Sequence, residues 1–217
     1  MNTEWSDLNK KMNINIKKKS TFYEGIDILL ELRKELMEQI IGFKELLNRE
    51  DFNEIPFINA KGYHNKTIAY SLYHIFRIED IVSNSLIKKR DQIFLKDNYC
   101  ERMKSPIIST GNELIKQEIA IFSSKLNLDE LYKYINDVDV STTQLLKELS
   151  YDNIKIKMTE QDKELLKSLD VVSNDAIWLI DYWCDKNIQG LIQMPFSRHW
   201  IMHIEASLRI KNKIYKS

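Results

Sequence analysis

The sequence predicts an all-α protein, built as a four-helix bundle with short extra helices in the connections. Apolar residues recur at steps of three and four over four long segments, roughly 21–49, 66–89, 127–149 and 195–213. This spacing places them on one face of a helix. The 217 residues include only 5 glycines and 3 prolines, so residues that interrupt helices are scarce. Four long apolar faces are buried by packing against one another, which favours a bundle.

The length of the chain is typical of one domain with a substantial core. We expect residues 1–20 to form a flexible arm or capping segment, with the lysines at 10–11 and 17–19 in solvent. Residues 21–217 are expected to form the bundle.

Local signals mark where the helices begin and end. Residues 21–24 read TFYE, the pattern of a capping box, and Asn127 is expected to open the helix at 127–149. Pro195 suits the first turn of the last helix, and Gly190 is expected to break the chain before it. Shorter helices are expected to end near Ser124 and to occupy 159–169 and 174–186. Residues 151–157 alternate weakly and are the only candidate strand.

Composition and charge narrow the classes of function. The chain carries 32 basic and 32 acidic residues, so no global field favours nucleic acid or an anionic membrane. No apolar run has transmembrane length, and the first residues contain no signal-peptide hydrophobic region. Cys100 and Cys184 are far apart and no CxxC occurs, which argues against a cysteine zinc site. These features together predict a cytoplasmic protein.

Three histidines are candidate ligands of one divalent metal ion. His199 and His203 are four residues apart, so they share one face of the last helix, in line with its apolar stripe. His74 lies in the wide apolar arc of the second long helix. Three protein ligands with an open position are typical of catalytic zinc sites, and nickel, cobalt or ferrous iron also accept nitrogen ligands. The alternative is that these are hydrogen-bonded core histidines. His64, in a loop, is not expected to take part.

The sequence around the histidines excludes several known site types. The pair reads HWIMH, which lacks the glutamate of HExxH metalloproteases, and no Glu-x-x-His supports a di-iron site. Glu79, Asp80 and Glu205 are near the histidines in sequence but on other helix faces. They are candidates for orienting the imidazoles from outside, or for pairing at the surface or between helices.

Two segments resemble motifs of the DinB-like (YfiT-like) superfamily. Residues 71–80, SLYHIFRIED, are similar to its second-helix motif, and residues 194–203, MPFSRHWIMH, to its final-helix H-x3-H motif. The resemblance implies a four-helix bundle with a long crossover after the second helix. It also implies one divalent metal, often zinc or nickel, held by His74, His199 and His203. Members of the superfamily include hydrolase-like proteins, thiol transferases that use bacillithiol or related thiols, and mycothiol-dependent isomerases; many have no known activity.

The resemblance implies a metal-dependent enzyme that acts on small molecules, either a thiol S-transferase or a hydrolase. Trp178, Tyr182 and Trp183 are expected to line its pocket, and a low-molecular-weight thiol is a candidate substrate. An exposed apolar patch around Trp178 and Trp183 would favour a homodimer. The alternative function is a non-catalytic stress-related or interaction bundle that binds metal loosely or not at all.

Overall fold

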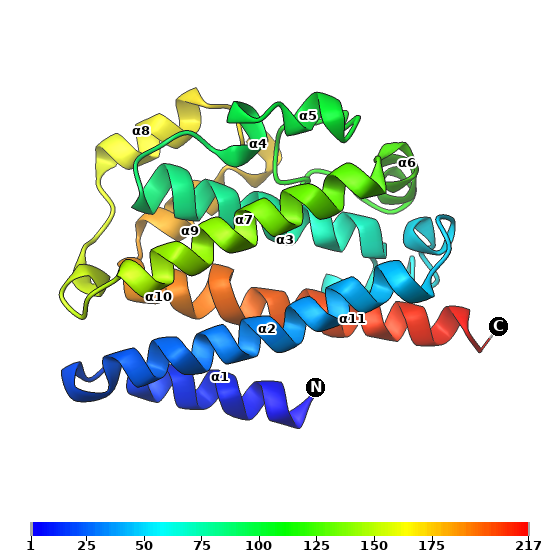
Figure 1. The fold of residues 1–217 in the computed structure, drawn as a ribbon. Coiled ribbons are helices and arrows are strands. Elements are labelled where there is room, and N and C mark those ends of the chain that lie inside the picture. Colours follow the sequence, from blue (N-terminus) through cyan, green and yellow to red (C-terminus); the bar gives the residue numbers. More distant parts are fainter. Residues whose placement is uncertain (1, 217) are drawn as a thin grey trace.

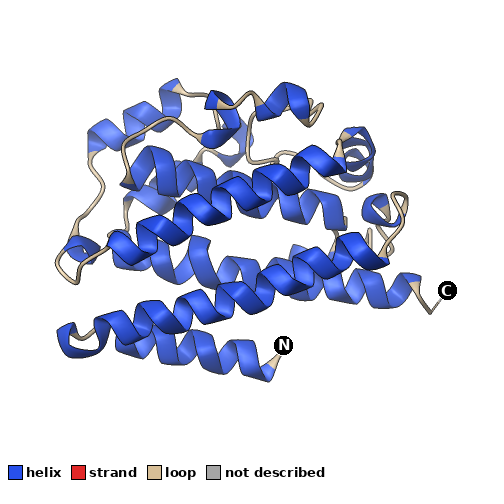
Figure 2. Cartoon of the chain, viewed as in Figure 1, coloured by secondary structure: helices blue, strands red, loops and turns tan. Residues whose placement is uncertain are grey.

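The computed structural model describes residues 2–216, and over this range its regular structure is helical, as predicted (Figure 2). The four long segments all form helices. Their observed bounds are α2 Phe22–Leu46, α3 Ile68–Asp80, α7 Leu128–Glu148 and α11 His199–Ile214. Two π-helices extend this set: η4, Ile81–Ile87, continues α3, and η7, Met194–Arg198, leads directly into α11.

The four long helices pack side by side around a common core. α3 contacts α7 and α11, and α2 contacts the same two helices from the other side (Figure 1). α3 and α7 run in the same direction, opposite to α2 and α11. The chain therefore crosses over between α3 and α7. This connection carries three short helices, α4 Ile93–Lys96, α5 Tyr99–Arg102 and α6 Gln117–Lys125.

The N-terminal segment is a helix packed on the bundle, so of the two expected forms it is a capping segment and not a flexible arm. α1, Thr3–Asn15, is capped by the Asn2 side chain and packs along α2 (Figure 1). Trp5, Met12 and Ile16 are buried against the bundle, whereas the lysines at 10–11 and 17–19 are exposed as predicted. The apolar residues of this segment thus supply the burial that holds it in place.

Of the two helix starts predicted from capping residues, the one at Asn127 is confirmed and the capping box at residues 21–24 is not. Asn127 accepts hydrogen bonds from the backbone N–H groups of Asp129 and Glu130, as expected at the start of α7. The predicted capping box at residues 21–24 is wrong, because the Thr21 side chain donates to the carbonyl oxygen of Asn15 instead. That bond closes the turn between α1 and α2, which the capping prediction did not anticipate.

The chain from 150 to 193 also differs from expectation. Residues 151–157 form no strand; they contain a 3-10 turn, η5 Asn153–Lys155, and a single bridge from Lys157 to Asn187. Gly190 does not break the chain, because it lies in α10, Ile188–Gln193, where its N–H donates to the Asn187 side chain. The remaining elements are α8 Glu160–Ser168, η6 Asn174–Ala176 and α9 Trp178–Cys184. The connection from α2 to α3 carries η2, Asp51–Asn53, and η3, Gly62–His64, whereas η1, Lys19–Thr21, lies between α1 and α2.

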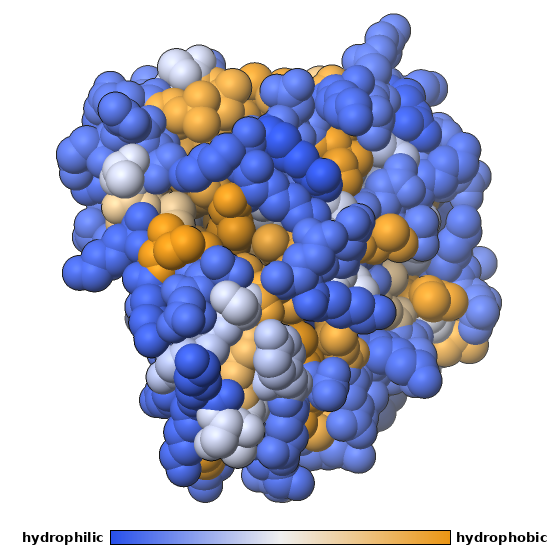
Figure 3. All heavy atoms as spheres, turned by 60° about the vertical axis from the view of Figure 1, so that its left-hand side comes forward, coloured by the Kyte–Doolittle hydropathy of each residue, from blue (hydrophilic) through white to orange (hydrophobic). Residues whose placement is uncertain are grey.

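The surface mixes polar and apolar side chains. On the face shown in Figure 3, hydrophobic residues form separate patches among hydrophilic ones. Among the described residues, no helix is both long and apolar enough to cross a membrane.

Candidate metal centre

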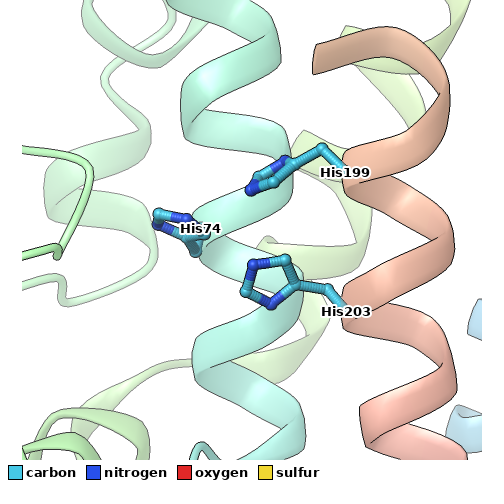
Figure 4. A group of neighbouring side chains, drawn as sticks. All are labelled: His74, His199 and His203. Atoms are coloured by element: carbon cyan, nitrogen blue, oxygen red, sulfur yellow. The ribbon is translucent and has the colours of Figure 1, made fainter. Parts of the chain in front are cut away.

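The structure brings the three predicted histidines together. His74 projects from α3, and His199 and His203 project toward it from successive turns of α11 (Figure 4). Each offers a ring nitrogen, and these three nitrogens lie within 4.8 Å of one another. All three side chains are buried. His64, in η3, is outside this group.

The local fold explains why these side chains converge. Every residue of α3 is buried, so His74 faces other helices wherever it points. A π-helix ends at the residue before His199, and Pro195 lies in its first turn. Single π-turns inside helices occur frequently at functional sites. The two histidines of α11 share a face because they are one helical turn apart.

The hydrogen bonds of the imidazoles differ. His74 Nδ1 lies 2.7 Å from the carbonyl oxygen of Thr110, in the crossover connection. A carbonyl only accepts, so Nδ1 carries the proton and Nε2 keeps a free lone pair. Among the described atoms, His199 Nδ1 and both ring nitrogens of His203 have no partner. A hydrogen bond that orients the imidazole is therefore seen for His74, whereas His203 has none among the described atoms.

Burial keeps the three imidazoles neutral. It lowers the pKa of His74 to about 4, with a smaller contribution from the positive charge of Lys66. Burial also lowers the pKa values of His199 and His203 well below the ordinary value, and the neighbouring histidines add to the effect. Neutral imidazole is the form that binds metal ions.

The residues present fit a divalent ion that prefers nitrogen ligands. A buried polar atom without a hydrogen bond costs about 1–3 kcal/mol, and His203 alone has two such atoms. A metal ion bound to one of them would offset part of this cost. The cluster contains no carboxylate, which suits zinc or nickel better than calcium or magnesium, since the latter two prefer oxygen ligands.

The nearby carboxylates pair between helices. Glu79 accepts two hydrogen bonds from the Arg33 guanidinium, at 2.9 and 2.8 Å, and one from the Trp200 indole N–H at 2.7 Å. Asp80 accepts from the backbone N–H groups of Ile93 and Phe94. Of the two roles considered for these residues, interhelix pairing is the one observed. Glu205 accepts a hydrogen bond from the backbone N–H of Asn2, at the start of α1.

Arg33 is a buried charged residue that the sequence pattern did not predict to lie near the site. Its guanidinium is buried, donates to Glu79, Asp139 and the Phe196 carbonyl oxygen, and lies 4.1 Å from the centre of the Trp200 ring. The two carboxylates raise its pKa above the ordinary value despite burial. Arg33 thus links α2, α3, α7 and the helix that carries the histidine pair. A signal was present, because Arg33 interrupts the buried stripe between Leu29 and Leu36.

A cavity of about 290 Å³ opens beside the histidines. Its wall includes His74 and His199, together with Trp178, Tyr182 and Trp183 as predicted. Tyr63, from η3, also lines it, and its ring packs edge-on against His203 with 4.7 Å between ring centres. No sequence pattern indicates a role for Tyr63, because its position depends on how the loop that contains η3 folds over α11.

The two tryptophans of α9 differ in exposure. Trp178 is 56% exposed, whereas Trp183 is 1% exposed. The predicted apolar surface patch therefore includes Trp178 but not Trp183.

The chain matches neither a model of a known protein family nor a curated protein.

Proposed function

We propose that this chain is a DinB-like metalloprotein in which His74, His199 and His203 hold one divalent ion, zinc or nickel, for a reaction on a small molecule. The observation that carries the proposal is the convergence of three buried, neutral imidazoles within 4.8 Å, beside a cavity. Core histidines without a metal would be expected to find hydrogen-bond partners, yet three of the ring nitrogens here have none.

The arrangement of the helices supports the resemblance on which the family assignment depends. The segment 71–80 lies on α3, and the segment 194–203 spans η7 and the start of α11. The long connection between α3 and α7 agrees with the crossover that the resemblance implies (Figure 1). Order along the chain and placement in space thus agree with the motif positions.

The residues around the proposed metal site would have separate roles in metal binding and in substrate binding. His74 offers Nε2, because its hydrogen bond to Thr110 fixes the proton on Nδ1. The aromatic wall of the cavity limits the water that reaches a bound molecule. A divalent ion, when bound, would supply Lewis acidity and lower the pKa of a coordinated water or thiol.

We propose a thiol S-transferase or hydrolase reaction, with the small-molecule substrate in the cavity beside His74 and His199. A closed structural zinc site has four protein ligands, whereas this cluster has three and adjoins a cavity. Assays of thiol conjugation and of ester or amide hydrolysis, each with and without a chelator, distinguish the two reactions. Metal binding without turnover in either assay would favour the non-catalytic bundle.

Metal stoichiometry tests the site itself. Protein purified without added metal should hold one divalent ion per chain, measured by elemental analysis. His74→Ala, His199→Ala and His203→Ala should each lose most of it, because two remaining imidazoles bind weakly. His64→Ala is the matched control and should retain it, since His64 lies outside the cluster. Full metal in the three core variants would refute the site.

A further inference from the structure

The cavity beside the histidines has an unusual wall for a site expected to take a polar thiol. Its members are aromatic or aliphatic apart from the two histidines and Asn112, and none carries a formal charge. Four aromatic side chains contribute: Tyr63 from η3 and Trp178, Tyr182 and Trp183 from α9. A wall of this kind binds an apolar body, and its few polar groups fix orientation.

The histidine end of the cavity would attract negative charge. Three neutral imidazoles leave the charge of a divalent ion uncompensated, and the cluster contains no carboxylate. The nearby side chains that act on this region electrostatically include the cations Lys66, toward His74, and Arg198, toward Tyr63. One anionic group at this end is therefore favoured.

A second charge on the ligand would be poorly accommodated. A carboxylate or ammonium group deeper in the cavity would lose its hydration without a charged side chain on the wall to replace it. Peptide-like thiols such as glutathione carry several such groups. The size of the cavity, about 290 Å³, is near the lower end for sites that bind small molecules.

We propose that the ligand of this cavity is a small aromatic thiol with a single negative charge, bound with its thiolate toward the three histidines and its ring among Tyr63, Trp178 and Tyr182. This inference rests on the proposed metal site and narrows its substrate to apolar thiols. Trp178 and Tyr182 already pack edge to face, with 6.2 Å between ring centres. A ligand ring can extend this arrangement, because aromatic rings favour such contacts. Trp178 is the accessible member, being 56% exposed.

Isothermal titration calorimetry on the zinc-loaded protein tests the proposal with three thiols. Phenylmethanethiol and 2-mercaptoethanol share the thiol group but differ in the aromatic ring, and glutathione adds charges. Phenylmethanethiol should bind at least about tenfold more tightly than 2-mercaptoethanol, because burial of a phenylalanine-sized group is worth that much. Glutathione should bind no more tightly than 2-mercaptoethanol.

Two variants on adjacent residues locate the ring. Trp178→Ala should weaken phenylmethanethiol binding about fivefold, since one aromatic contact is lost, and should leave 2-mercaptoethanol unchanged. Ile177→Ala is the matched control, because Ile177 is exposed and outside the cavity wall, and it should change neither affinity.

Zinc content is measured on every sample before and after titration. Zinc retained with equal affinities for the two small thiols, or with glutathione bound most tightly, would overturn this inference and leave the proposed metal site intact. Wild-type protein that takes up no zinc would overturn both.

Discussion

At the scale of single residues, the neutral state of the histidine cluster has a consequence for stability. In the metal-free protein His74 stays neutral down to a pKa of about 4, whereas in the unfolded chain it takes up a proton near the ordinary value of 6.5. Between these values the unfolded state binds more protons, so stability falls as the pH falls. His199 and His203 act in the same direction.

We therefore predict that metal-free protein loses unfolding free energy from about pH 7 to about pH 5.5, by about 1 kcal/mol for His74 alone. Carboxylates with ordinary pKa values remain charged over most of this window, whereas burial raises the pKa of Glu79, which acts in the opposite direction. Urea denaturation at several pH values measures it. His74→Gln should show a smaller dependence, and a flat profile for the wild type would contradict the prediction.

The bond from Trp200 to Glu79 can be tested separately from the ring that carries it. Trp200→Phe keeps an aromatic ring but removes the N–H that Glu79 accepts at 2.7 Å. We expect a loss of about 2 kcal/mol in unfolding free energy, the range for a hydrogen bond to a charged group. Trp183→Phe, at a buried tryptophan outside this network, is the control in the same denaturation experiment. Equal losses in both variants would show that packing alone accounts for the effect.

At the scale of elements, two glycines in α2 illustrate opposite constraints. A Cβ at Gly25 would lie 2.7 Å from both the backbone nitrogen and the Cγ2 of Ile16, where α1 turns back onto α2. A Cβ at Gly42 would meet no atom within 4 Å. The first glycine permits close approach of the chain, and the second has no such role.

Gly25→Ala should destabilise the protein by about 1–3 kcal/mol through overpacking against backbone that cannot easily move. Gly42→Ala should stabilise it by about 0.5–1 kcal/mol, because alanine favours a helix interior. Thermal unfolding of the two variants gives shifts of opposite sign. A shift of the same sign in both would rule out the close contact with Ile16 as the cause.

Most differences between the predicted and the observed structure concern individual helices and the segments that connect them. The four long helices could be predicted because each repeats its apolar residues over many turns. The helical form of α1 could not be predicted, because in this segment only Trp5, Met12 and Ile16 are fully buried apolar residues, among many charged ones. Gly190 was misjudged because helix formation there depends on the side chain of Asn187. The histidine pair was evident from spacing, but the roles of Arg33 and Tyr63 depend on contacts between distant segments.

At the scale of the whole molecule, the exposed part of α9 bears on assembly. Ile177 and Trp178 are 42% and 56% exposed side by side, and exposed apolar residues in groups are typical of interfaces. We predict a homodimer in solution, as in the sequence-based expectation. Light scattering over a wide range of protein concentration measures the mass, and the monomer mass at every concentration would contradict the prediction.

The π-helix before α11 has a geometric consequence. An α-helix turns by about 100° per residue. Each extra residue in a π-turn therefore rotates the side chains after the turn, about the helix axis, relative to the side chains before it. Residues 194 and 195 line the cavity wall, and His199 follows after η7. The wide turn therefore fixes the angle between the cavity wall and the histidine face. Deletion of one residue within η7 would rotate the two by roughly a quarter turn, even if every remaining side chain were unchanged.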